Sequence, residues 1–231
     1  MVLSEGGLWT IQDWSEDDKL LLVKKYVRYS FPSFRLSAIR IIYSSLSSVN
    51  ESTIYVLNLE TKALTQINPK EGTLAEGIIS FFVPCADHDL AGQISYGGGC
   101  FAKGTNSQGV FFTSDEGSEF QHLRYYDLAH KAFLPHKEGG VPASLTDDIP
   151  WDVDTFTMSD QGDRIAFITN EDGISKLYAL DFEVSNEGAA LHVKRRDEVK
   201  IPMGQAYNLR FHPDGKQIGV SLNTPQVHIL R

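Results

Sequence analysis

The chain has 231 residues, of which 42% are hydrophobic and 11% are aromatic, and its formal net charge is −9. This length and composition predict a folded domain with a sizeable core, and they are atypical of disordered chains. The negative charge argues against a nucleic-acid partner, because phosphate recognition favours a basic face. No apolar run reaches the ~18 residues that a membrane span needs, so we expect none.

The two cysteines, Cys85 and Cys100, lack the close spacing of a metal-binding motif. Such sparse cysteines are typical of a reducing compartment, and a disulfide between these two is the less favoured alternative. The first residues, Met1–Gly7, show neither the basic start nor the apolar run of a secretion signal. We therefore expect a cytoplasmic location.

Taken in chain order, residues 8–23 are predicted to form a strand, a polar Ser-Glu-Asp-Asp turn and a second strand. The same form recurs at Phe211–Val220, where Pro213 and Gly215 are the usual turn residues, since proline pre-sets φ and glycine tolerates a positive φ. Asp18 stands where Gly215 stands, and aspartate is a tolerable but poorer choice there.

Two segments interrupt the pattern, near residues 28–47 and 74–92, and we interpret both as insertions. The first lies in Lys19–Asn50, which has no acidic residue, so a basic patch for a membrane surface or an acidic partner is the alternative. Gly97–Gly99 predicts either a close approach of main chain to another group or a sharp turn. A phosphate cradle is disfavoured there, because a strand rather than a helix follows.

A strand–turn–strand pattern with alternating apolar residues recurs along the chain. The copies are Ile54–Thr65, Leu123–Leu134, Leu177–Phe182 and the short Val227–Arg231. In the first two copies Asn58 matches Asp127 and Lys62 matches Lys131. An Asp or Asn at the end of a strand is typical of a tight turn.

The clearest unit runs from Phe156 to Asp181 and is predicted to form a three-stranded meander. Ile165 follows its counterpart Val110 by 55 residues, and Gly215 follows Gly162 by 53. A period of this size, built from four short strands, is typical of a β-propeller. We therefore predict an all-β fold in a single domain over 1–231, a partial propeller of about four blades arranged as an open arc.

No catalytic set stands out. The segments beginning at Gly173 and Gly219 carry Ser175 and Ser221 but lack the second glycine of a Gly-x-Ser-x-Gly elbow. The seven histidines form no metal-binding spacing, and we expect His212 to cap a turn. The acidic turns at 114–119 and 170–173 are interpreted as hairpins rather than Ca²⁺ loops. We predict no catalytic, cofactor-binding or metal-binding residue, and no cofactor.

Four pieces of the sequence resemble the β-propeller of the prolyl oligopeptidase family of serine peptidases, in its dipeptidyl-aminopeptidase and acylaminoacyl-peptidase branch. These pieces are Gln12–Ser15, Phe112–Gly117, Ile165–Tyr178 and Leu209–Lys216. In that family the propeller caps an α/β-hydrolase domain, restricts access to short peptides and helps to place the substrate. The resemblance implies the non-catalytic, substrate-gating part of such a peptidase, since neither its catalytic residues nor its paired propeller glutamates have a match here.

The implied partners are therefore an α/β-hydrolase catalytic domain, absent from these residues, and short peptides. We also expect self-association through open strand edges. TolB-like propellers share the His-Pro-Asp-Gly-Lys turn, so a stand-alone protein-interaction propeller is the alternative. A third alternative is a propeller enzyme such as a lactonase, which would need a metal-binding cluster at the central channel.

Overall fold

The computed structural model describes residues 8–29, 46–68, 94–105, 107–134, 144–185 and 190–224. The regular structure in these ranges consists of strands. The first sheet holds β1 (Leu8–Trp14), β2 (Leu20–Tyr29), β3 (Leu46–Asn58) and β4 (Leu64–Asn68). The second holds β5 (Tyr96–Phe101), β6 (Gly109–Ser114), β7 (His122–Asp127) and β8 (Ala132–Leu134). The third holds β9 (Val153–Met158), β10 (Arg164–Glu171), β11 (Ile174–Ser185) and β12 (Ala190–Val199), and the last is the hairpin β13 (Gln205–Phe211) and β14 (Ile218–Asn223).

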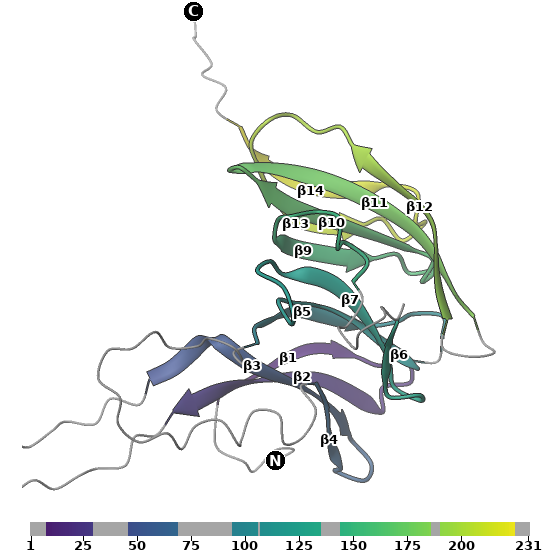
Figure 1. The fold of residues 1–231 in the computed structure, drawn as a ribbon. Coiled ribbons are helices and arrows are strands. Elements are labelled where there is room, and N and C mark those ends of the chain that lie inside the picture. The colour runs from purple at the N-terminus through teal and green to yellow at the C-terminus, as the bar shows by residue number, and fades with distance from the viewer. Residues whose placement is uncertain are drawn as a thin grey trace, which may run out of the picture.

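Each sheet is an antiparallel meander in which neighbours in sequence are neighbours in space. The first strands of the sheets lie next to one another, β1 beside β5, β5 beside β9 and β9 beside β13. The sheets follow one another in chain order, and the purple first sheet and the yellow hairpin lie at opposite ends (Figure 1). The predicted partial propeller, an open arc of about four sheets, is therefore confirmed, with β1, β5, β9 and β13 as its inner strands.

The turns that follow inner strands β1, β9 and β13 repeat one backbone geometry. In each turn the N–H group of the fourth residue donates to the carbonyl of the first residue. These bonds run from Asp18 to Ser15, from Gly162 to Ser159, and from Gly215 to His212. The φ angles of Asp18, Gly162 and Gly215 are 58°, 74° and 69°. The predicted equivalence of Asp18 and Gly215 is confirmed. His212 also caps its turn as predicted, because its ring Nδ1 accepts the Asp214 N–H at 3.2 Å.

The turns that precede the outermost strands of the first two sheets are equivalent as well. Asn58 Oδ1 accepts the N–H groups of Glu60 and Thr61, and Asp127 Oδ1 accepts that of His130. The matched lysines of these turns, Lys62 and Lys131, have φ angles of 62° and 52°. The predicted strand end at Asp181 is wrong, since β11 continues to Ser185 through a bulge at 181–182 and so pairs with a longer β12.

Alternation along the second strand of each sheet builds the core. We call the side of a sheet that faces the preceding sheet its front, and the other side its back. In β10, Ile165 and Phe167 pack forward with Phe111 of the second sheet, while Ala166 and Ile168 pack backward against the last hairpin. Burying each large side chain contributes about 1.5–3 kcal/mol, so stability comes from contacts between sheets.

The two predicted insertions lie mostly outside the described residues, which omit 30–45 and 69–93. At the first, the β2–β3 ladder still pairs Arg28 with Ser47 and Tyr29 with Leu46. Both insertions stay predictions, as does the fourth repeat copy at Val227–Arg231, which also lies outside the described residues.

Candidate functional site

A cavity of about 330 Å³ opens between the inner strands of the three complete sheets. Its walls come from β1, β5 and β9, together with one residue of β6 and one of the turn after β5. The lining residues are Gln12, Asp13, Gly98, Gly99, Cys100, Lys103, Thr113, Asp154, Thr155, Phe156, Thr157 and Met158. The volume falls in the range of small-ligand sites, and the residues come from segments far apart in sequence.

The glycines of β5 shape one wall of this cavity. A Cβ added at Gly97 would lie 2.0 Å from Thr113 Oγ1 and 2.8 Å from Gln121 Oε1. The absent side chain leaves room for the Thr113 hydroxyl, which donates to Gln121 Oε1 at 3.2 Å. The predicted close approach at Gly97–Gly99 is thus confirmed. Next to it, Gly98 is exposed and presents bare main chain to the cavity.

Two carboxylates from different sheets give the cavity an acidic wall. Asp13 Oδ2 accepts the Phe101 N–H at 2.8 Å, a bond that ties β1 to β5. Burial, and then the nearby negative charge of Asp152, raise the pKa of the Asp154 carboxyl above its usual range. The Asp154 carboxyl therefore holds a proton more readily than an ordinary surface aspartate does.

Cys100 lies beside these carboxylates as a free thiol. Burial, and then the charge of Asp13, raise the pKa of the thiol. The thiolate is the reactive form of cysteine, so Cys100 stays protonated and unreactive at neutral pH. Cys85, the other half of the disulfide considered from the sequence, lies outside the described residues.

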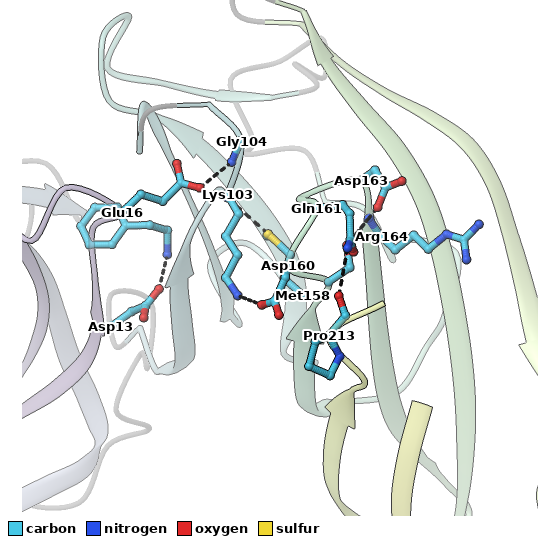
Figure 2. Close-up of polar contacts among 12 residues, drawn as sticks. Asp13, Glu16, Lys103, Gly104, Met158, Asp160, Gln161, Asp163, Arg164 and Pro213 are labelled. Atoms are coloured by element: carbon cyan, nitrogen blue, oxygen red, sulfur yellow. Dashed lines mark hydrogen bonds and ion pairs between the residues drawn. The ribbon is translucent and has the colours of Figure 1, made fainter. Parts of the chain in front are cut away.

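The turns after the inner strands tie neighbouring sheets together (Figure 2). Glu16 Oε1 of the first sheet accepts the Gly104 N–H at 2.9 Å. Lys103 Nζ bonds Asp160 Oδ1 of the third sheet at 2.7 Å. Gln161 Nε2 in the third sheet donates to the Pro213 carbonyl of the last hairpin at 3.0 Å. Each of these polar bonds crosses from one sheet to the next.

The serines considered as nucleophiles lie in strands. Ser175 is in β11, where its Oγ accepts the Ala206 N–H at 2.9 Å and helps to join the third sheet to β13. Ser221 is in β14. Neither occupies a strand-to-helix elbow. The predicted hairpin turns within 114–119 and 170–173 join β6 to β7 and β10 to β11, and Asp172 and Gly173 have positive φ angles of 52° and 81°.

A serine, a histidine and a threonine lie in contact at the β6–β7 turn, a contact that the sequence pattern did not predict. Ser118 Oγ lies 2.9 Å from His122 Nε2, and Thr146 Oγ1 lies 3.3 Å from His122 Nδ1. Both hydroxyl oxygens already accept main-chain N–H groups, from Phe120 at 3.1 Å and from Leu123 at 3.1 Å. This buried chain closes the β6–β7 turn and holds 144–146 against β7, which is a structural role. The spacing Ser-x-x-x-His across a turn was the signal available in the sequence.

Within the described ranges, no group of three or more His, Cys, Asp or Glu side chains could hold a metal ion. In the same part of the chain, no helix is long and apolar enough to cross a membrane.

No family model and no curated protein matches this sequence. Among solved structures, a putative TolB from Agrobacterium tumefaciens is similar with a TM-score of 0.47 and 10% identity, over 84% of this chain and 51% of that one. A chain from a study of two prolyl endopeptidases is similar with a TM-score of 0.48 and 15% identity, over 96% of this chain and 27% of that one. The chain thus spans about half the length of the first and about a quarter of the second.

Proposed function

We propose that these residues form the non-catalytic, substrate-placing part of a serine peptidase of the prolyl oligopeptidase type, with the cavity between β1, β5 and β9 receiving a short peptide. The observation that carries the proposal is the makeup of this cavity. Bare main chain at Gly98 and the carboxylate of Asp154 face it from different inner strands. The four sequence pieces that resemble this family add support.

The chemistry of an extended peptide suits these walls. A peptide offers main-chain N–H and C=O groups, which can pair with an open strand edge such as that of β5. The carboxylates of Asp13 and Asp154 line the cavity and would attract a positively charged group, either a terminal amine or a basic side chain. The volume of about 330 Å³ suits a short segment and is far too small for a folded domain.

The chain itself should bind without cleaving. Ser175 and Ser221, the two serines compared with the Gly-x-Ser-x-Gly motif, lie in strands. Burial keeps the thiol of Cys100 protonated. We expect no turnover of aminoacyl or peptidyl chromogenic substrates by the purified 231-residue chain. Measurable turnover that survives repeated purification would overturn this part of the proposal.

Calorimetric titration with a short basic peptide tests the cavity directly. A Cβ at Gly98 would meet only Phe156 Cε1, at 4.0 Å, so Gly98→Val should fold normally while its methyl groups narrow the cavity. We expect at least about a tenfold loss of peptide affinity in this variant. Gly219→Val is the matched control, since Gly219 lies in β14 away from the cavity and has ordinary contact distances. Equal affinity of both variants and the parent would contradict the proposal.

A further inference from the structure

Three charged side chains line the cavity in the part of the chain that the structure describes. Asp13 and Asp154 are carboxylates, whereas Lys103, from the turn after β5, is a cation. The Lys103 charge already acts on the cavity: burial and then Asp13 raise the pKa of the Cys100 thiol, and Lys103 opposes them. An ammonium group inside the cavity would counteract the acidic wall that attracts a basic peptide.

The Lys103 ammonium is held by a partner outside the set of lining residues. Lys103 Nζ bonds Asp160 Oδ1 at 2.7 Å, in the turn after β9 (Figure 2). The hydrogen bond from Lys103 lowers the pKa of the Asp160 carboxyl, so Asp160 is ionised at neutral pH. The negative charge of Asp160 therefore draws the ammonium toward the turn of the third sheet.

Only the side chain of Lys103 is free to change place. Its main-chain N–H donates to Met158 Sδ at 3.4 Å, and its carbonyl oxygen lies where a Cβ at Gly162 would meet it at 2.1 Å. The side chains of Lys103 and Asp160 are 35% and 59% exposed, and ion pairs this exposed are weak. The position of the ammonium thus depends on the charge of Asp160.

We propose that Asp160 sets the charge preference of the cavity by holding the Lys103 ammonium away from its acidic wall. Asp160 is a positioning residue, because it acts through Lys103 and does not touch the peptide. Without the Asp160 charge, the ammonium would compete with the peptide's cationic group for Asp13 and Asp154, and it would offer a partner to an acidic group. The inference rests on the proposed peptide site and assigns its preference for basic peptides to a residue outside the cavity.

Calorimetric titration of the 231-residue chain with two peptides of equal length tests the proposal. One peptide carries a lysine and an amidated C-terminus, and the other carries a glutamate and an acetylated N-terminus. We expect Asp160→Asn to weaken binding of the basic peptide at least about fivefold and to strengthen binding of the acidic one. Glu183→Gln is the matched control, since it removes one charge from the exposed Lys194–Glu183 pair, whose residues do not line the cavity. It should leave both affinities unchanged.

The same titrations in a Lys103→Met background separate this mechanism from a direct effect of the Asp160 charge on the peptide. If Lys103 carries the effect, Asp160→Asn should then change the affinity for the basic peptide less than about twofold. An equal loss in both backgrounds would overturn the inference, because direct Coulomb effects add independently. Circular dichroism verifies that each variant is folded, and Lys103→Gln replaces Lys103→Met if the latter does not fold.

The parent chain distinguishes failure of this inference from failure of the proposed function. A parent that binds the basic peptide, with the same preference in Asp160→Asn, would overturn the role of Asp160 alone. A parent that binds neither peptide would overturn the proposed peptide site, and the role of Asp160 with it.

Discussion

Asp18 and Gly215 occupy the same position in two turns that are 197 residues apart, with φ angles of 58° and 69°. Both follow an inner strand, and both donate their N–H to the carbonyl three residues earlier. Glycine adopts this left-handed conformation freely, whereas an L-residue with a side chain is strained there.

Asp18→Gly should therefore stabilise the chain by about 0.5 kcal/mol, because relief of backbone strain exceeds the added entropy of the unfolded chain. The melting temperature should rise by about 1–2 °C, measured by calorimetry. Asp17→Gly is the matched control and should destabilise, since Asp17 Oδ1 accepts the Ser15 hydroxyl at 2.7 Å and the Lys19 N–H at 3.2 Å. A loss of stability in Asp18→Gly would contradict the assignment of strain.

Gly162 and Gly173 both have positive φ angles, yet they should respond differently to alanine. A Cβ at Gly162 would lie 2.1 Å from the Lys103 carbonyl oxygen, whereas nothing lies within 4 Å of one at Gly173. We expect Gly162→Ala to cost more than about 2 kcal/mol and Gly173→Ala about 1 kcal/mol in urea denaturation. Equal losses would mean that the turn of the third sheet does not press against the second sheet.

Asp154→Asn should raise the stability of the fold at neutral pH. The folded-state pKa of Asp154 is raised, so the folded chain holds the proton more tightly than the unfolded chain, and ionisation destabilises the fold as pH rises through that pKa. Asparagine removes this penalty, which is below about 1 kcal/mol because solvent screens the group. The gain should vanish below about pH 4, where the unfolded carboxyl is protonated too.

Asp160→Asn is the control of opposite sign. The hydrogen bond from Lys103 lowers the pKa of Asp160, so its ionised form stabilises the fold, and that contribution is present above the usual carboxyl pKa. This variant should lose stability at neutral pH and match the parent in acid. If both variants shift the melting temperature in the same direction at pH 7, the charge assignment is wrong.

Phe111→Ala should be among the most damaging core changes. Phe111 is fully buried, and its ring lies 4.8 Å from that of Tyr125 and 5.2 Å from that of Phe182 in the third sheet. Removing it leaves a cavity between two sheets and should cost about 3–5 kcal/mol. Ile174→Ala, at an exposed position, should change stability by less than about 0.5 kcal/mol. Chemical denaturation of both variants tests whether stability resides between the sheets.

Local patterns in the sequence predict the strands and turns well, because each depends on a few adjacent residues. Alternation predicts β9, β10 and the start of β11, and turn chemistry predicts the equivalence of Asp18 with Gly215. The end of β11 was not predicted, because a bulge at 181–182 lets the strand continue past Asp181, whereas Asn58 and Asp127 mark turns in the first two sheets.

The cavity could not be predicted from such patterns, because it depends on how the sheets are placed relative to one another. Asp13 reaches the Phe101 N–H across 88 residues of sequence, and nothing local marks either as a partner. Gly97–Gly99 did signal a close approach, but Thr113, the residue that approaches, comes from another strand.

The proposed occupant of the cavity between β1, β5 and β9 is a short peptide. Isothermal titration of the 231-residue chain with peptides of two to ten residues, and in parallel with folded proteins of equal charge, tests it most directly. We expect binding of the short basic peptides, a plateau in affinity once the cavity is filled, and no binding of the folded proteins. Binding of folded proteins without any binding of short peptides would contradict the account and favour a protein-interaction propeller.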